Sequence, residues 1–282
     1  MDWSKTKTIF IIVFLILDIF LFTLFMNKYQ SSQLEVKSEL TFDQRFLKDN
    51  ITFETPPPDD VDAHPYLNAS VYRFSASEVS DLKGQTASVR NNLVLESKLD
   101  TPLDIDDPSD PEELEDYLEE FVTGGEDYTF WDYQEGENRL IYHQEFKDMP
   151  LYHNINGRLV VHLNDSNQAI GYEQTMLTSI EEFAEEQTII TPETALEGFY
   201  RRNIIEPNSE VIEVELGYYP FIQLSEATAN TQVLTPTWRM LVEQEDGDRD
   251  NHYMNAVNPS IIEINQESLE FQRLEEIQET VE

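Results

Sequence analysis

Residues 110–125 read DPEELEDYLEEFVTGG, and this stretch predicts a helix at the start of a repeated structural unit. Asp110-Pro111 is typical of a helix start, and Gly124-Gly125 of a helix end. The apolar residues between them follow the i, i+3, i+4, i+7 spacing of a single helix face: Leu114, Tyr117, Leu118 and Phe121. We therefore expect this face to pack against a sheet.

A run of short strands is expected after this helix. Asn156-Gly157 is a strong signal for a type I′ turn, so the segments on either side of it are predicted to pair as a hairpin. The expected strands span residues 128–134, 139–146, 151–155, 158–163 and 169–177. Before the helix the pattern is weaker, with strand-like runs at 72–76 and 93–95 and an acidic loop at 101–110.

A second stretch follows the same plan. Thr191-Pro192-Glu193 predicts another helix start, and the apolar side of that helix is formed by Ala195, Leu196, Phe199 and Tyr200. Strands are expected at 211–218, 233–242, 251–257 and 261–264. The chain is therefore predicted to be α+β, with two similar lobes that each pack a helix on an antiparallel β-sheet.

An apolar segment precedes both lobes. Residues 9–26 are apolar except for Asp18 and Thr23, and as a helix they would be about 27 Å long, enough to cross a bilayer. Lys5 and Lys7 come before this segment, so the positive-inside rule places residues 1–8 in the cytoplasm. We expect a single-pass protein of the cell membrane whose C-terminal domain is extracellular.

Asp18 lies at the centre of the predicted span. An acidic residue there costs about 2.5–3.5 kcal/mol on insertion scales, and it gains from meeting a donor on another helix. Helical spacing places one set of apolar residues on its side of the helix as a packing seam: Ile11, Phe14, Leu15, Leu21, Phe22 and Phe25. We predict that this seam contacts a membrane partner; the alternative is a protonated Asp18 in a plain anchor.

The predicted segments divide the chain. After the cytoplasmic tail (1–8) and the transmembrane helix (9–26) come a juxtamembrane stalk and Pro linker (27–60), which ends near Pro56-Pro57-Pro58. Lobe 1 is assigned to 61–187, lobe 2 to 188–265, and an acidic tail to 266–282.

Composition excludes several functions. The chain has 56 Asp+Glu against 18 Lys+Arg, a formal net charge of -38, which opposes binding to nucleic acid. It has no Cys, which removes disulfides and thiolate catalysis. No nucleophile elbow, phosphate loop or zinc-protease motif is present in the sequence. We expect no catalytic residues and no cofactor. The acidity favours solubility, or alternatively steers the protein toward a basic partner.

Histidines give a weak metal signal. His143, His153 and His162 fall on neighbouring predicted strands, but strand alternation places His143 and His162 opposite the apolar side chains, facing solvent. The acidic segment 246–250 lacks the spacing of a calcium loop and is typical of a hairpin turn. No metal site is predicted.

Aromatic residues suggest a contact surface. Segments 130–133 and 218–221 each contain more aromatic residues than one face of a small sheet usually buries. Candidates for an exposed patch are Trp131, Tyr133, Tyr219 and Phe221. The alternative is that the helix and the other lobe cover both faces.

The N-terminal sequence MDWSKTKTIF (1–10), leading into FLILDIF (14–20), closely resembles the YycI family of Gram-positive membrane proteins. The resemblance continues through GRLVV (157–161), GYEQ (171–174) and TPTWR (235–239). It implies an accessory regulator, not an enzyme, that associates with a YycH-type protein and the YycG (WalK) sensor histidine kinase, whose two-component system governs cell-wall metabolism. It also implies two helix-on-sheet lobes of the YycH type. Residues 238–256 are weakly similar to PepSY-type protease-propeptide modules.

The functional expectation is regulation of that kinase through membrane helices and extracellular surfaces. One alternative is a protease-propeptide-like inhibitor or sensor of a wall hydrolase. Another is a receptor for a wall ligand or lipid, which would need a deep apolar pocket between the lobes.

Overall fold

The computed structural model describes residues 3, 7, 11, 13–15, 17–22, 42–58, 63–110, 114–221 and 230–264. The chain divides into two compact units, Met1–Asn50 and Ile51–Glu282. The N-terminal unit contains helical residues between positions 11 and 22 and the helix α2 (Phe42–Lys48), which lies inside the expected stalk. Among the described residues, no helix combines the length and the hydropathy needed to cross a membrane.

The predicted membrane seam is described in part. Its described members are helical and exposed to solvent, and so is Asp18. These members are Ile11, Phe14, Leu15, Leu21 and Phe22. Lys7 is also exposed, whereas Lys5, Phe25 and the tail 266–282 lie outside the described residues.

The second unit contains two sheets. Sheet A has the order β1-β11-β12-β13-β14, and β2 joins it through β12 and carries β10 on its other edge. The pair β1–β11 is parallel and the other pairs are antiparallel. The strands are β1 (Thr52–Phe53), β2 (Ala63–Val71), β10 (Leu177–Thr188), β11 (Glu210–Pro220), β12 (Thr231–Glu243), β13 (Arg249–Asn255) and β14 (Ile261–Ile262).

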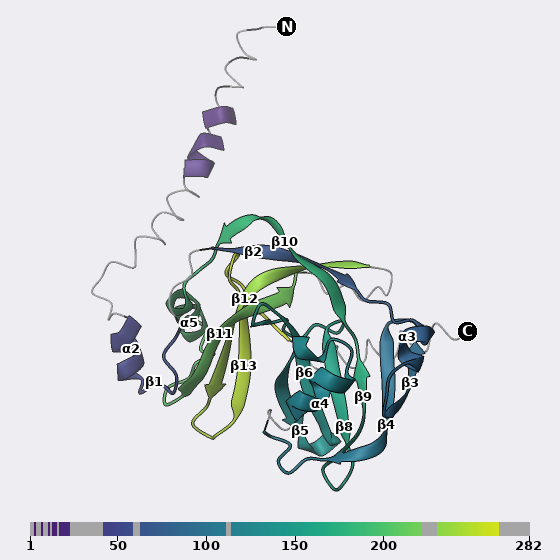
Figure 1. The fold of residues 1–282 in the computed structure, drawn as a ribbon. Helices are drawn as coiled ribbons and strands as arrows, with labels where there is room; N and C mark the ends of the chain where they lie inside the picture. The colour runs from purple at the N-terminus through teal and green to yellow at the C-terminus, as the bar shows by residue number, and fades with distance from the viewer. Residues whose placement is uncertain are drawn as a thin grey trace. The chain divides into compact units, whose positions relative to one another are not determined.

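Sheet B is antiparallel, with the order β3-β4-β9-β8-β6-β5 and the short β7 paired to β6. Figure 1 shows it beside sheet A. Its strands are β3 (Gln85–Arg90), β4 (Val94–Asp104), β5 (Tyr128–Gln134), β6 (Arg139–Phe146), β7 (Met149–Pro150), β8 (Arg158–Leu163) and β9 (Gln168–Gln174).

Each sheet carries a helix (Figure 1). Helix α4 (Glu115–Phe121) covers one face of sheet B, where Leu118 packs in a core with Tyr142 and Tyr172. Helix α5 (Pro192–Arg201) lies against sheet A, where Trp238 Nε1 donates a hydrogen bond to the Ile190 carbonyl at 2.8 Å. The shorter helices are α3 (Ala76–Ser80), η2 (Gly125–Asp127) and η3 (Glu135–Glu137). The predicted α+β class is confirmed.

Several predicted elements are confirmed. Helix α5 begins after Thr191, whose side chain accepts a hydrogen bond from the Thr194 amide, and its buried residues include Ala195, Leu196 and Phe199. Strands β5 and β6 have the predicted bounds. In these segments the apolar periodicity and the end signals agree, so local sequence is sufficient to define them.

The predicted hairpin around Asn156-Gly157 is wrong. Strand β8 pairs with β6 and β9, and residues 151–157 form turns. Their backbone is held by contacts distant in sequence: Leu151 forms an isolated bridge to Tyr218, and the Tyr152 amide donates to the Tyr218 carbonyl at 2.7 Å. Tertiary contact with sheet A therefore overrides the local turn signal.

Residues 72–76 do not form the predicted strand. Ser75 is instead the N-cap of α3, in a capping box with Glu78. The predicted loop at 101–110 begins as strand, because β4 continues to Asp104. Strand β10 was not predicted because its sequence is highly charged; its pairing with β2 defines it.

The close approach of β11 to the turn after β7 allows a test. A Cβ atom at Gly217 would lie 2.5 Å from Tyr152 Cε2 and 2.6 Å from the Pro150 carbonyl oxygen. We predict that Gly217→Ala lowers the free energy of unfolding by about 1–3 kcal/mol, measured by urea denaturation. Gly136→Ala is the control, because nothing lies within 4 Å of its Cβ position. Equal stability of the two variants would contradict this packing.

Candidate functional site

A cavity of about 1140 Å³ lies between the two sheets. Sheet B contributes residues of β5, β6 and β8, and sheet A contributes residues of β13 and the segment 261–264. Arg202 and Ile204, just after α5, and His153 and Ile155, in the turn after β7, also line it. The cavity therefore lies on the face of sheet B that is opposite the α4 core, because its lining residues alternate with core residues along β6.

The cavity has a different charge balance from the rest of the chain. Its lining includes four arginines, Arg139, Arg158, Arg202 and Arg249. It also includes four acidic residues, Asp132, Glu137, Asp250 and Glu263. The whole chain has 56 acidic residues against 18 Lys+Arg. Basic side chains are therefore concentrated at this place.

The predicted solvent exposure of His143 is wrong. His143 is only 2% exposed and lines the cavity. Strand alternation correctly placed it opposite Tyr142, but sheet A covers the face on which it lies. His153 lies beside it, with ring centroids 5.4 Å apart, whereas His162 is partly exposed near Glu173. Within the described residues, no group of three or more His, Cys, Asp or Glu side chains is arranged to hold a metal ion.

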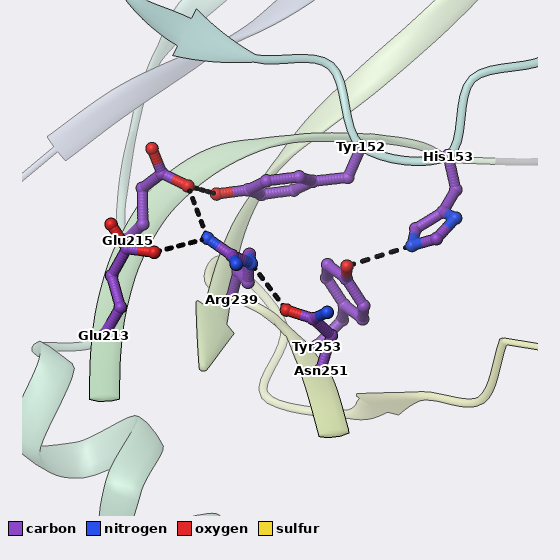
Figure 2. Close-up of polar contacts among 7 residues, drawn as sticks. All are labelled: Tyr152, His153, Glu213, Glu215, Arg239, Asn251 and Tyr253. Carbon is purple, nitrogen blue, oxygen red and sulfur yellow. Dashed lines mark hydrogen bonds and ion pairs between the residues drawn. The ribbon is translucent and has the colours of Figure 1, made fainter. Parts of the chain in front are cut away.

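A polar network includes three residues of the cavity lining, His153, Asn251 and Tyr253 (Figure 2). Arg239 Nη1 lies 2.8 Å from Glu213 Oε2 and 3.2 Å from Glu215 Oε2, and Arg239 Nε donates to Asn251 Oδ1 at 2.7 Å. From the turn after β7, the Tyr152 hydroxyl donates to Glu215 at 2.8 Å. His153 Nε2 lies 2.9 Å from the Tyr253 hydroxyl. Residues 152 and 153 thus connect to sheet A through side chains as well as backbone.

Trp131 joins the two sheets. One side of its indole stacks on His143, with ring centroids 4.5 Å apart and an interplanar angle of 22°. The Arg239 guanidinium carbon lies 4.4 Å from the centre of the indole ring. Trp131 belongs to β5 in sheet B and Arg239 to β12 in sheet A, so this cation–π contact crosses between the sheets.

Burial controls protonation in this region. It lowers the pKa of His153 to about 4, with further lowering from the charges of Arg158 and Arg239. Burial lowers the pKa of His143 well below its ordinary value, and it raises the pKa of Glu215. Both imidazoles are therefore neutral near pH 7 and act as hydrogen-bonding groups there.

The four aromatic candidates occupy different places. Trp131 and the buried Tyr219 belong to one cluster with Tyr152 and Tyr253. Tyr133 packs against the core of sheet B, and Phe221 is 58% exposed with an edge contact to Tyr66. The structure brings together the first two and separates the others; their role in contacting a partner stays a prediction.

The arginines of the cavity were not identified from the sequence. They come from distant segments, and only the pairing of strands brings them together. The sequence did contain a partial signal for this face of the sheet: Arg139, Ile141 and His143 are spaced two residues apart on β6, so their side chains lie on the same face. A receptor for a wall ligand or lipid would need a deep apolar pocket between the lobes, whereas the cavity between the sheets is lined by both charged and apolar residues.

The comparisons with known proteins identify a family. The family model described as "YycI protein" matches residues 29–257. No curated protein matches this sequence. This chain is also similar to an uncharacterized protein from Eubacterium rectale ATCC 33656, whose crystal structure was determined at 1.45 Å resolution. The two have a TM-score of 0.43 and 10% sequence identity, and the match covers 76% of this chain and 89% of that chain.

The buried histidines predict a pH dependence of stability. In the unfolded chain His153 titrates near 6.5, whereas in the fold its pKa is about 4. As pH falls from 6.5 to 4 the unfolded state takes up a proton that the folded state does not, so stability is full above 6.5 and decreases below it. We expect His153 to account for about 3 kcal/mol of this loss, measured by urea unfolding at several pH values.

His153→Gln keeps a hydrogen-bonding group for Tyr253 and should flatten the pH profile between 6.5 and 4. If the wild-type and His153→Gln profiles run parallel, the assignment of the pH dependence to His153 is wrong.

Arg239 predicts a second stability effect. Its side chain is 11% exposed and pairs with Glu213 and Glu215, so Arg239→Gln would leave the partly buried Glu215 carboxylate without its cation and would remove the contact with Trp131. We expect a loss of about 3 kcal/mol in the free energy of unfolding. Arg249→Gln, which removes an exposed pair with Glu243, should have little effect in the same assay. Similar losses for both variants would count against a structural role specific to Arg239.

Proposed function

Because this chain belongs to the YycI family, we propose that it regulates a YycG/WalK-type sensor histidine kinase by forming a complex with the kinase and with a YycH-type protein. Family membership itself establishes the coarser role: YycI proteins are non-catalytic regulatory accessory proteins of a two-component system. The observation that carries the proposal is the match of the family model over residues 29–257.

The structure supports a binding role. The second unit has buried cores on both sheets, and its charged cavity is lined by neutral histidines and by arginines. Such a domain can present surfaces to partners. A regulator must bind one signalling state of the kinase more tightly than the other, and a difference of about 1–3 kcal/mol changes the ratio of states about 5- to 150-fold.

Membrane attachment is part of the proposal. YycI proteins are membrane-anchored. We assign residues 9–26 as the single span, residues 1–8 with Lys5 and Lys7 to the cytoplasm, and the C-terminal domain to the outside. Residues 27–60 would form the stalk and linker, and 266–282 an acidic tail.

The lobe boundaries 61–187 and 188–265 also belong to the proposal. Sheet B and α4 fall within the first range, and α5 with β11 to β14 fall within the second. Strands β2 and β10 come from the first range and pair with each other, and β2 pairs with β12 of the second. In this division β2 and β10 connect the lobes.

The proposed contact within the membrane centres on Asp18. The described seam residues Ile11, Phe14, Leu15, Leu21 and Phe22 are exposed on the described helical segment, as a surface that meets another helix requires. A carboxyl group at this depth gains most from a donor on a neighbouring helix.

Site-specific crosslinking tests this contact. With a photoreactive residue at position 18 in intact membranes, we expect a covalent adduct with the sensor kinase or the YycH-type protein, identified by mass spectrometry. Phe20 points about 160° away on an ideal helix and is the matched control position. Asp18→Leu should reduce co-purification of the partner. Equal crosslinking from positions 18 and 20, or unchanged co-purification, would contradict the proposed seam.

A further inference from the structure

We propose that the cavity between the sheets is a binding site for a multivalent anionic ligand, a molecule with several carboxylate or phosphate groups held by Arg139, Arg158, Arg202 and Arg249. This inference goes beyond kinase regulation, since ligand binding can be measured without the kinase. It rests on the cavity, on the arginines that line it, and on buried imidazole nitrogens that have no partner.

Charge is the first argument. Four of the ten arginines of the chain line this one cavity, although the formal net charge of the chain is -38. An anion is repelled by most of such a surface, so it gains where guanidinium groups balance the acids. The planar guanidinium fork also matches carboxylate and phosphate oxygens in two parallel hydrogen bonds, which suits Arg better than Lys for this task.

The arginines are positioned before any ligand arrives. The side chain of Arg139 is 22% exposed, with Nε donating to Gln134 at 2.6 Å and Nη2 lying 2.7 Å from Glu137. These contacts fix the orientation of its guanidinium at the cavity wall. Arg158 pairs in register with His143 on the neighbouring strand and therefore lies on the same face of sheet B.

Unpartnered polar atoms are the independent observation. His143 is 2% exposed and lines the cavity, and its Nδ1 is buried with no hydrogen-bond partner. Nε2 of His252, another lining residue, has none either. A buried polar atom without a partner costs about 1–3 kcal/mol of free energy, and a ligand that supplies the missing partner recovers this cost.

The remaining lining favours an organic ligand. Isoleucines lie among the charged groups, and they provide apolar surface for the part of the ligand that carries the anionic groups. They are Ile141, Ile155, Ile204, Ile261, Ile262 and Ile264. The cavity volume of about 1140 Å³ is large enough for a ligand of several groups, and contacts from both sheets would hold the sheets together.

Titration calorimetry on the full-length protein in phosphatidylcholine nanodiscs tests the site. The probes are triglutamate as the carboxylate, tripolyphosphate as the phosphate, and triglutamine as the neutral match for triglutamate. We expect at least one of the two anions to bind about tenfold more tightly than triglutamine, with weaker binding at higher salt. The preferred anion distinguishes a carboxylate from a phosphate ligand.

Variants assign the binding to the cavity. Arg139→Gln combined with Arg158→Gln should weaken the preferred anion about tenfold. Arg202→Gln with Arg249→Gln changes exposed positions that do not threaten folding, and it should weaken binding in the same direction. Arg73→Gln is the matched control, because Arg73 is exposed, pairs with Asn230 and does not line the cavity. It should bind as the wild type does.

His143→Phe separates binding from folding. The phenyl ring can keep the stacking on Trp131 while the unpartnered nitrogen is removed, so thermal stability should stay equal or increase while anion affinity decreases about threefold or more. The proposal is overturned if neither anion binds better than triglutamine, or if Arg73→Gln weakens binding as much as the cavity variants do.

Discussion

Arg239 lies at the contact between the two sheets, together with the bonds that residues 151–153 make to sheet A. Its guanidinium faces the Trp131 indole of the opposite sheet and pairs with Glu213 and Glu215 of its own sheet. Removing one partner of a buried ion pair is costly because it leaves an uncompensated charge. On sheet B the same indole contacts the imidazoles of His143 and His153, so Arg239 and both histidines meet at Trp131.

The cavity lies beside this contact between the two sheets. Two of the cavity arginines lie on strands that pair with the strands of the cation–π contact: Arg139 on β6, beside β5, and Arg249 on β13, beside β12. Trp131 itself lines the cavity, so a ligand there would lie next to this contact. For a non-catalytic accessory protein with the function proposed above, this is a physical route by which a bound ligand changes the surfaces offered to its partners. If a ligand binds one arrangement of the sheets more tightly than another, the free-energy difference between the two arrangements changes by the difference in binding free energy.

Sequence reasoning predicted the elements whose local signals agree. Helix α5, with Thr191 as N-cap and Ala195, Leu196 and Phe199 on one face, was predicted by spacing and capping alone. Sequence reasoning failed where contacts between distant residues determine the structure. The backbone of residues 151–157 is held by bonds to Tyr218 and does not form the hairpin that its turn signal predicts. Strand β10 has a highly charged sequence, and it forms because it pairs with β2. His143 had the correct phase on its strand, but a single strand cannot reveal that a second sheet covers that face. The cavity could not be predicted because its arginines come from segments spread between residues 139 and 249, and only the packing of the two sheets brings them together.

The most direct test of this account is a double-mutant cycle between Trp131→Leu and Arg239→Gln, measured as free energies of unfolding in urea. A cation–π contact across the sheets predicts that the two losses are not additive, with a coupling energy of about 1 kcal/mol or more. The same cycle between Trp131→Leu and Arg249→Gln should be additive, because Arg249 pairs with Glu243 instead. Additive losses for Trp131 and Arg239 would contradict the claim that this contact joins the two sheets.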